Sequence, residues 1–569
     1  MIVSTVGALT LTPMLSSQLL KLNPKKGRLY TLFFTPIEKA LDALDHGYSR
    51  FLYWAVRHRK TVIFGATLIF AGSMLLVPTI KTEFFPTQDN AQISVHIELP
   101  VGTRQDITRK LALEIDELFR QKYPEIKTSN FTEGQADSDN TWAQLSNNGT
   151  HIIDYYINML SVGDRERGMV EICEEMRKDL AKYPEIKTFK VIEGGQESGM
   201  GGQNAVEIEI YGFDFGRTDA VAAELAERMR KVKGCSQVNI SREDYIPEYQ
   251  VDFDREKLAI NGLNITTAAL ALRNRINGST ASKYREDGDE YDIKVRYAPE
   301  FRQSVEDIEN ILVYNSAGQG IRIRDLGKVV ERMTPPTIER KDRERVITVS
   351  AVVGKGAALS DIVTAAREQL KQMDIPSDVS WQLGGSYEDQ MDTFFDLTIL
   401  MILIIILVFI VMAAQFESLT DPFVIMFSIP FAFTGIILGL AVTQTPLGVM
   451  ALIGLIMLMG IVVKNGIVLI DYTILCRERG MGILTAVVTA GKSRLRPVLM
   501  TTLTTVLGMI PMAVGTGEGS EMWRSMGMTV AWGLSVSTLI TLVIVPVVYS
   551  VFAGNGVRRR RRKMAKSRK

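Results

Sequence analysis

The chain alternates between long runs without a single charged residue and one large block in which apolar and polar residues are mixed. A membrane-spanning helix needs about 20 consecutive apolar residues. The charge-free runs are long enough for six complete spans and the end of a truncated one, because the run 422–463 is divided by a hinge at 443–448. The spans are predicted at 61–80, 397–416, 422–442, 449–475, 497–517 and 527–553, and the truncated helix at 1–20.

The mixed block, residues 81–396, contains an internal repeat. The heptapeptide KYPEIKT occurs at 122–128 and again at 182–188, and each copy ends an amphipathic pattern and begins an alternating one. Such units pack as a split βαβ sandwich. We therefore predict a membrane α-helical bundle plus an α+β domain of split βαβ (ferredoxin-like) repeats. Its helices are predicted at 104–122 and 165–182, and weaker strand-helix-strand units at 205–241 and 346–383.

Three further segments of this block could carry function. Residues 248–334 form an insertion with several predicted strands, among them 321–330, and such an insertion either docks a partner or only stabilises the fold. The glycine-rich stretch 194–203 lacks the Gly-Lys-Ser/Thr of a phosphate-binding loop and is predicted to be a linker. The polar loop 134–150 is long for a connection within a sheet, which makes it a candidate substrate loop. Its candidate contact residues are Asp137, Asp139 and Trp142.

Basic residues are concentrated in three segments that fall on one side of the membrane if the spans alternate. These are 21–60, 473–496 and the tail 554–569. Because cytoplasmic loops are enriched in Lys and Arg, we expect these segments in the cytoplasm and residues 81–396 on the opposite, periplasmic side. The apolar residues within 21–60 favour a helix in the membrane interface, with a solvated linker as the alternative. The tail is explained as a topology anchor, and the net charge of +1 argues against a nucleic-acid partner.

The residues that usually carry enzyme or metal chemistry are few and scattered. The three cysteines and four histidines show no paired or metal-ligand spacing, so free thiols and no metal site are predicted. No constellation of a nucleophile and a base is recognisable, so no catalytic site is predicted and a conventional enzyme is not expected.

One charged residue, Lys464, interrupts the predicted span 449–475 in the sequence GIVVKNGIVLIDY. It lies fifteen residues after Val449 and thirteen before Arg477, about halfway along a spanning helix at 1.5 Å per residue. An ammonium group at that depth costs about 2.5 to 3.5 kcal/mol, and such a residue is by default a functional candidate that needs a counter-charge. The alternative is a lysine that snorkels or ties two helices together. The other predicted spans contain no acidic residue, so the counter-charge is expected from elsewhere.

Several phrases of the sequence resemble the C-terminal half of resistance-nodulation-division (RND) efflux pumps of the hydrophobe/amphiphile branch. They are ALTLTPML, FFPTQDNAQISVHIELPVGT, AAQFESLTDPF, KNGIVL, RLRPVLMTTL and IVPVVYSV. The resemblance implies a homotrimeric, multi-pass permease of the Gram-negative inner membrane that exchanges protons for hydrophobic or amphiphilic molecules such as drugs, detergents and bile-salt-like compounds. It also implies a periplasmic adaptor protein and an outer-membrane channel as partners, and the proton-motive force in place of a cofactor.

The resemblance places the family's proton-relay lysine, arginine and threonine on Lys464, Arg494 and Thr501. Arg494 and Thr501 are seven residues apart, which by itself puts them on one helical face. Asn465 and Asp471 are candidates for a supporting role. The family's relay aspartates belong to its N-terminal half, which would explain why Lys464 lacks a counter-charge here. We therefore expect a fragment of a longer pump, with an N-terminal half on a separate chain as the alternative.

The resemblance also divides the periplasmic block into two pore subdomains, 87–196 and 197–247 plus 335–394, and a docking subdomain, 248–334. The loop 134–150 would be the family's switch loop, although it is rich in Asp, Ser and Asn instead of phenylalanine.

Two other functions stay open at the level of sequence. A heavy-metal RND permease generally lacks the lysine found at 464 and uses methionine ligands. A non-transporting membrane scaffold or export accessory would need no charge at mid-membrane.

Overall fold

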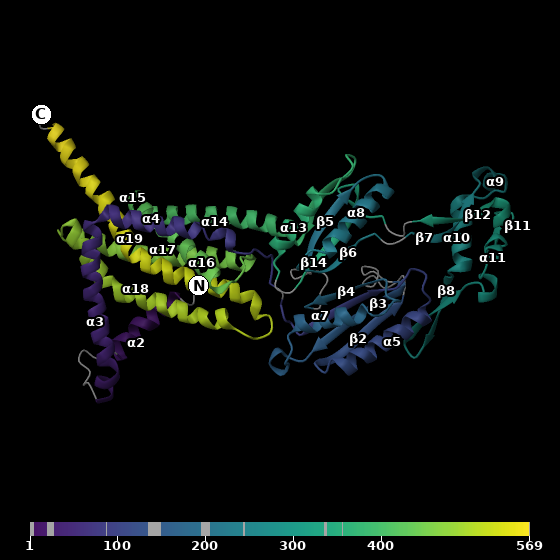
Figure 1. The fold of residues 1–569 in the computed structure, drawn as a ribbon, viewed down its shortest axis with the longest axis horizontal. Helices are drawn as coiled ribbons and strands as arrows, with labels where there is room; N and C mark the ends of the chain where they lie inside the picture. Colours follow the sequence, from purple (N-terminus) through teal and green to yellow (C-terminus); the bar gives the residue numbers. More distant parts are fainter. Residues whose placement is uncertain are drawn as a thin grey trace.

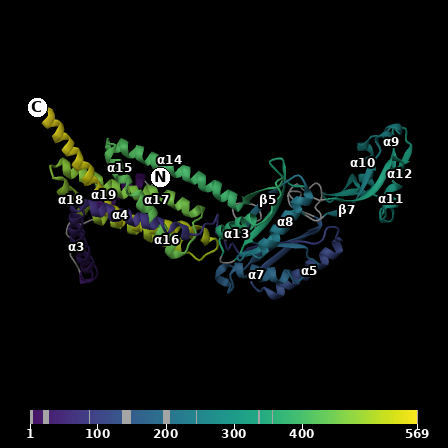
Figure 2. The same cartoon turned by 45° about the horizontal axis from the view of Figure 1, so that its top comes forward.

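The computed structural model describes residues 5–19, 28–86, 88–134, 149–194, 205–242, 245–334, 338–354 and 357–567. The molecule is elongated, with a helical bundle at one end, two α+β units next to the bundle, and a small module at the far end (Figures 1 and 2). We call the α+β units the first sheet unit (88–194) and the second sheet unit (205–242 with 338–385), and we call residues 245–334 the distal module.

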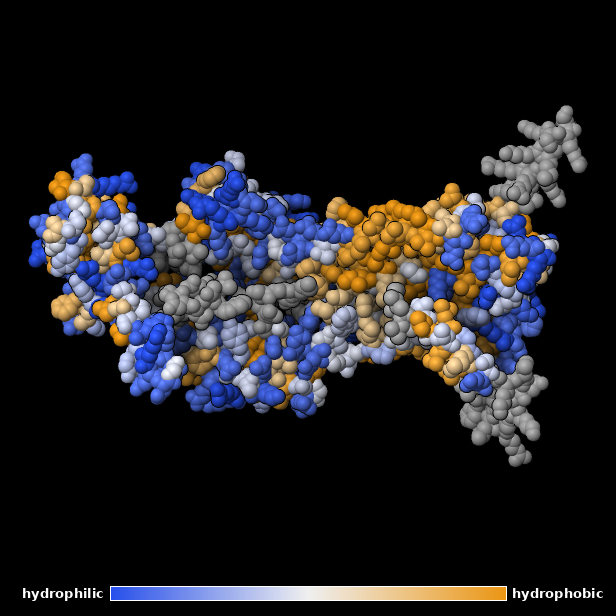
Figure 3. Space-filling model, turned by 180° about the vertical axis from the view of Figure 1, so that it is seen from behind, coloured by the Kyte–Doolittle hydropathy of each residue, from blue (hydrophilic) through white to orange (hydrophobic). Residues whose placement is uncertain are grey.

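The bundle holds six helical segments that are long and apolar enough to cross a membrane, counted over the described residues. Apolar side chains cover it as a broad band, whereas the sheet units are mostly polar outside (Figure 3). The segments consist of α4 (Arg59–Met74), α14 (Ser386–Phe416), α15 (Thr420–Met426) with α16 (Ile429–Thr443), α17 (Val449–Glu478), α18 (Ile483–Val514) and α19 (Ser520–Ser567). The short helix α2 (Thr12–Leu19) follows a π-helical stretch, Gly7–Leu11.

Two helices extend beyond their charge-free cores. The basic segment 473–496 is not a loop throughout: it is helical except between Glu478 and Ile483, so α17 and α18 both continue into it. Charged residues end a hydrophobic run but do not end a helix, since Lys, Arg and Glu are good helix formers in water. For the same reason α14 begins at Ser386, well before the predicted start at 397.

Helices α16 and α19 pack closely because glycines face each other. A Cβ added to Gly435 would lie 2.9 Å from the Cα of Gly533, and a Cβ added to Gly439 would lie 2.5 Å from the Cβ of Trp532. Small residues let membrane helices approach until their backbones touch, and van der Waals packing then replaces the missing hydrophobic effect.

A long helix, α3 (Arg28–Arg57), crosses the end of the bundle that is remote from the sheet units (Figure 1). Tyr48 on α3 donates a hydrogen bond to the carbonyl oxygen of Leu542 at 2.7 Å. Arg496 on α18 pairs with Asp42 at 2.5 Å and with Asp45 at 2.8 Å. These contacts fix α3 across α18 and α19.

The first sheet unit follows the order strand, helix, strand, strand, helix, strand. Its four strands are antiparallel in the order β2-β3-β1-β4, and both helices contribute to one apolar core on the sheet. Both KYPEIKT copies lie at the turn from a helix into a strand, and neither Ile126 nor Ile186 is helical, as the repeat predicts. The elements are β1 (Gln92–Glu98), α5 (Gln105–Lys122), β2 (Ile126–Gly134), β3 (Gly149–Met159), α7 (Met169–Leu180) and β4 (Thr188–Glu193).

The second sheet unit has the same order of strands, interrupted by the distal module. Strand β14 pairs with β5, β6 and β13, and β15 pairs with the other edge of β5. The elements are β5 (Ala205–Tyr211), α8 (Phe215–Arg230), β6 (Cys235–Ile240), β13 (Arg340–Lys341), β14 (Glu344–Val353), α13 (Leu359–Lys371) and β15 (Ser380–Gly385).

Strand β15 runs directly into the membrane helix α14. Gly385, at the junction, has φ +64°, and a Cβ there would lie 2.7 Å from the side chain of Glu207, so the turn requires glycine. Lys341 donates to buried Glu209 at 2.9 Å and to Glu388 in the first turn of α14 at 2.8 Å. The second sheet unit and α14 are therefore one joined body.

The distal module hangs on a two-stranded ribbon of β7 (Ile246–Phe253) and β12 (Gly327–Thr334). The stretch 321–330 is not the single strand that its pattern predicts. Ile323 and Leu326 are fully buried and form a helical turn, α12 (Ile323–Leu326), between the short strand β11 (Gly320–Arg322) and the ribbon strand β12. The other elements are α9 (Arg255–Ile260), α10 (Ile265–Ile276), β8 (Ser279–Glu286), β9 (Asp289–Val295), α11 (Val305–Glu309), β10 (Leu312–Tyr314) and β11 (Gly320–Arg322).

Candidate functional site

Lys464 lies halfway along α17, on the side of the helix that the rest of the described chain leaves open. Its neighbours on that side repeat at helical spacing and form one exposed stripe. Among the described residues Lys464 makes no ion pair, whereas Arg496 on α18 pairs with Asp42 and Asp45. The stripe consists of Ile453, Met457, Gly460, Lys464, Asp471 and Leu475.

The next residue, Asn465, points the opposite way into the bundle. Its side-chain nitrogen donates to the hydroxyl of Thr502 on α18 at 3.3 Å and to the hydroxyl of Thr538 on α19 at 3.2 Å. The two hydroxyls lie 3.3 Å from each other, and all three side chains are buried. Interhelical hydrogen bonds of this kind hold membrane helices at a fixed mutual depth.

Thr501 shares this depth with Lys464 because each is the direct neighbour of a residue in the triad. Whereas Thr502 faces inward, Thr501 is exposed and donates its hydroxyl hydrogen to the carbonyl oxygen of Val498 at 3.0 Å. The middle of α18 is open over the same stretch, with Met500 and Leu503 strongly exposed. The hydrogen bond between Asn465 and Thr502, which face inward, therefore holds Lys464 and Thr501, which face outward, at the same level of the bundle.

Arg494 lies two turns from Thr501, towards the end of the bundle that α3 crosses. Its guanidinium carbon is 4.6 Å from the centre of the Tyr472 ring on α17, a cation–π contact. The buried Nε of Arg494 has no hydrogen-bond partner among the described residues. Arg494 is thus held next to α17 by an aromatic face, while part of its hydrogen-bonding capacity is unused.

The structure separates the remaining sequence candidates. Asp471 is exposed on the Lys464 stripe two turns away, at about 10 Å along the axis, and makes no described ion pair. Asp137, Asp139 and Trp142 lie outside the described residues. Sequence reasoning missed Thr502, Thr538 and Tyr472, since nothing in a linear pattern pairs residues on three different helices.

The sheet units contain a separate buried charge cluster that the sequence did not indicate. His96 on β1 lies between Asp154, 2.5 Å from Nδ1, and Glu98, 3.0 Å from Nε2. Burial by itself would lower the pKa of His96, but the hydrogen bonds and charges of these two carboxylates raise it to about 9. The cluster braces the pairing of β1 with β3.

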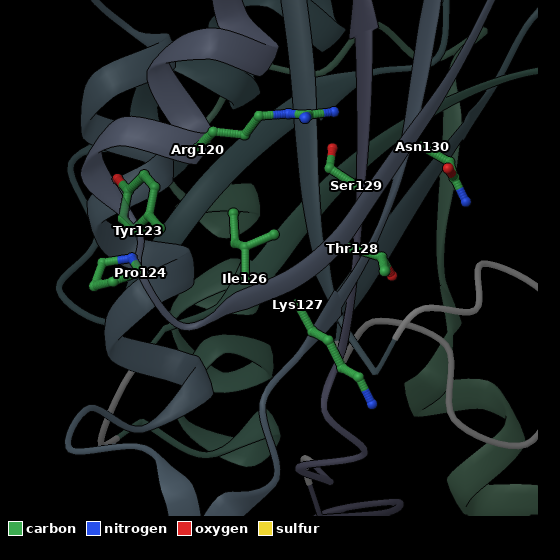
Figure 4. A pocket seen from close by; sticks show the side chains of 8 residues that line it. All are labelled: Arg120, Tyr123, Pro124, Ile126, Lys127, Thr128, Ser129 and Asn130. Atoms are coloured by element: carbon green, nitrogen blue, oxygen red, sulfur yellow. The ribbon is translucent and has the colours of Figure 1, made fainter.

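A hollow of about 390 Å³ lies next to the edge strand β2 and is lined by residues of the first KYPEIKT copy and its flanks (Figure 4). Arg120, at its rim, is paired with Asp116 at 2.8 Å, and Ser129 donates to the same carboxylate at 2.8 Å. Arg120 and Ser129 are therefore already paired within the fold, and the hollow lies in the first sheet unit and not in the bundle that holds Lys464. No group of three or more His, Cys, Asp or Glu suited to a metal occurs among the described residues.

Comparison with known proteins places this arrangement in a family. The AcrB/AcrD/AcrF family model matches residues 1–553. The chain belongs to the AcrB/AcrD/AcrF family of RND permeases. Its membership confirms the resemblance seen in the sequence.

Relatives in this AcrB/AcrD/AcrF family are about twice as long as the chain. The swarming motility protein SwrC of Bacillus subtilis (strain 168) is 29% identical over 558 residues, which cover 97% of this chain and 51% of SwrC. The multidrug resistance protein MdtC of Yersinia pestis bv. Antiqua (strain Angola) is 26% identical over 554 residues, which cover 97% of the chain and 52% of MdtC. The chain thus spans about half the length of the curated relatives it matches.

A crystal structure of a heavy metal efflux pump, crystal form II, has the same fold as this AcrB/AcrD/AcrF family member. The two superpose with a TM-score of 0.72 at 24% identity, over 90% of this chain and 52% of the pump chain. At this identity the similarity concerns the fold and not the substrate.

Proposed function

We propose that the chain supplies the C-terminal half of a proton-driven efflux permease for hydrophobic and amphiphilic compounds, such as drugs, detergents and bile-salt-like molecules. The observation that carries the proposal is the exposed Lys464, which lies halfway along α17 on an open face and at the same level of the bundle as the exposed Thr501. A lysine in that position needs an anion, and the open faces of α17 and α18 offer room for helices from outside the 569 residues.

In the proposed cycle, Lys464 pairs with ionised aspartates of the N-terminal half. Protonation of the aspartates releases the lysine, and α17 then shifts relative to the other half. One charge moved through 100 mV supplies about 2.3 kcal/mol, which is comparable with the cost of leaving such a lysine unpaired. Arg494 and Thr501 form the remainder of the relay, with Asn465 as support. No cofactor is required, since the proton-motive force drives the cycle.

The proposal also gives a location and a role to the part of the chain outside the bundle. Residues 81–396 lie in the periplasm of a Gram-negative cell, built of split βαβ repeats, with pore subdomains at 87–196 and at 197–247 plus 335–394. The distal module docks a periplasmic adaptor protein and an outer-membrane channel, and the pump is a homotrimer. The relative MdtC is a multidrug resistance protein, which supports the proposed substrate class.

The test is an efflux assay on the complete pump with Lys464→Ala. We expect drug accumulation to rise to the level of cells without the pump, while the variant remains inserted and trimeric. Lys492→Ala is the matched control, because Lys492 is an exposed lysine on α18 outside the mid-membrane region. Full efflux by Lys464→Ala would contradict the proposal, and so would proton-coupled efflux by the 569 residues alone.

A heavy-metal permease is the alternative within the family. It would be favoured if metal salts, but not drugs or detergents, accumulated in cells that carry Lys464→Ala.

A further inference from the structure

The segment that joins α4 to β1 touches both the membrane bundle and the first sheet unit. We call its described residues, 81–86 and 88–91, the strap. They are half-buried for most of their length. Lys81, at one end, forms an exposed ion pair with Asp361 on α13 at 3.0 Å. Two stronger anchors bind the strap to the start of α17 and to the first sheet unit.

The first anchor joins the strap to the beginning of α17. Thr82 and Leu447 form a parallel β-bridge. The amide of Leu447 donates to the carbonyl oxygen of Lys81 at 2.9 Å, and the amide of Glu83 donates to the carbonyl oxygen of Leu447 at 3.3 Å. The amide of Val449, the first residue of α17, donates to the carbonyl oxygen of Phe84 at 3.3 Å. The strap is therefore bonded through backbone groups to the helix that carries Lys464.

Gly448 makes this close approach possible. A Cβ at Gly448 would lie 3.3 Å from the carbonyl oxygen of Phe84 and 3.4 Å from that of Glu83, so a larger residue would press the strap away from α17. The hydrogen bonds here join backbone to backbone directly, which makes the anchor short and stiff.

The second anchor joins the strap to the first sheet unit through a buried ion pair. Oδ1 of Asp89 lies 2.5 Å from Nη2 of Arg165, and the Arg165 side chain is only 1% exposed. The carbonyl oxygen of Asp89 also accepts a hydrogen bond from the amide of Gly519, in the loop between α18 and α19, at 3.2 Å. Removing one partner of a buried ion pair is strongly destabilising, because the other charge is left without compensation.

We infer that the strap transmits movements of α17 to the first sheet unit, with Asp89 and Arg165 as positioning residues. The inference rests on the proposed function, in which α17 shifts when Lys464 loses its partner. Lys464 is fifteen residues from Val449, about 22 Å along a continuous helix, so an axial shift at the lysine appears at the strap. Coupling over such distances is carried by packed, hydrogen-bonded elements that connect the two places, and the strap is such an element.

The first experiment compares Asp89→Asn with Asp106→Asn in the complete pump. Asp106 forms an ion pair with Arg104 in the same sheet unit, but both side chains are well exposed, so this variant is the matched control. We expect Asp89→Asn to lower the maximal efflux rate about tenfold while the drug concentration for half-maximal efflux stays unchanged, and Asp106→Asn to leave both values unchanged. A loss of drug affinity at an unchanged maximal rate would overturn the inference.

The second experiment separates transmission from simple stability. Spin labels at Lys110→Cys on α5 and Glu368→Cys on α13 report the distance between the two sheet units at low and high pH. We expect the distance in the unmodified pump to depend on pH and this dependence to disappear in Asp89→Asn. A pH dependence that persists in Asp89→Asn would overturn the inference.

A lengthened strap keeps the test decisive if Asp89→Asn does not assemble. Two glycines inserted between Gln88 and Asp89 leave both anchors intact but slacken the chain between them. An assembled pump with this insertion is expected to lose most of its efflux, and normal efflux would overturn the inference. Normal efflux in the strap variants together with inactive Lys464→Ala would refute the strap alone, whereas active Lys464→Ala would refute the proposed function.

Discussion

The side-chain nitrogen of Asn465 lies 3.2 Å from the hydroxyl of Thr538, and this contact joins α17 to α19 at the level of Lys464. Because the hydroxyl of Thr502 closes the triad, three helices are held in register by three neutral polar groups. Lys464 and Asn465 are thus adjacent in sequence but face opposite sides of one helix.

Replacing Asn465 with Ala is expected to disturb the relay without touching the lysine. Two buried hydroxyls would lose a donor, at about 0.6 to 1.7 kcal/mol for an interhelical bond in a membrane. We expect a partial loss of efflux, about threefold to tenfold, and a shifted pH profile of transport. Initial efflux rates measured over a pH series check this. Ser535→Ala is the control, because among the described residues the Ser535 hydroxyl donates within α19, to the carbonyl oxygen of Ala531.

Replacing Gly435 with Leu is expected to prevent close packing of α16 and α19. The new side chain would meet the Gly533 backbone at 2.9 Å, and overpacking typically costs about 1 to 3 kcal/mol or more where backbone cannot move. We expect less folded pump in the membrane and a lower midpoint of thermal unfolding in detergent. Gly72→Leu should be tolerated, since a Cβ at Gly72 on α4 has no neighbour within 4 Å. Equal effects of both changes would refute this account of the packing.

The cluster around His96 predicts a pH-dependent stability of the first sheet unit. The pKa of His96 is raised from 6.5 to about 9, so its charge stabilises the fold fully below pH 6.5, and this contribution is lost as the pH rises through 9. The contribution amounts to about 3 kcal/mol. Hydrogen exchange of β1 and β3, corrected for intrinsic rates, should therefore speed up between pH 6.5 and 9.5.

His96→Gln supplies the comparison for this measurement. Glutamine can donate from its amide nitrogen but has no group that titrates over this range, so the exchange rates of the same strands should change little between pH 6.5 and 9.5. An unchanged slope in the variant would show that another group titrates.

The charge distribution predicts the orientation of the chain. Single cysteines at Lys110→Cys, in the first sheet unit, and at Thr485→Cys, near the start of α18, are both at exposed positions. The outer membrane of the cells is permeabilised while the inner membrane stays intact. We expect a membrane-impermeant maleimide to label the cysteine at 110 and not the one at 485. Labelling at 485 in intact inner membranes would reverse the assignment.

The local patterns of the sequence predicted the position of Lys464 halfway along a long helix and the helix-to-strand turns at both KYPEIKT copies, because both follow from the order of apolar and polar residues along the chain. They did not predict the partners of Asn465 or the stacking of Arg494 on Tyr472, since those contacts depend on how helices rotate against one another. The turn at Ile323–Leu326 was missed for a related reason. A short apolar stretch reads equally as a strand or as a buried helical turn until its surroundings are known.

Strand β15 continues directly into α14, so the length of α14 determines the orientation of the second sheet unit relative to the bundle. An α-helix turns about 100° and rises about 1.5 Å per residue. The number of residues between Ser386 and the membrane therefore sets how the second sheet unit is rotated about the axis of α14. One inserted residue would rotate the unit by about a quarter turn about the helix axis. Seven inserted residues would nearly restore the original orientation but would move the unit about 10 Å further from the membrane. The distal module is attached to the same unit through β7 and β12 and would rotate with it.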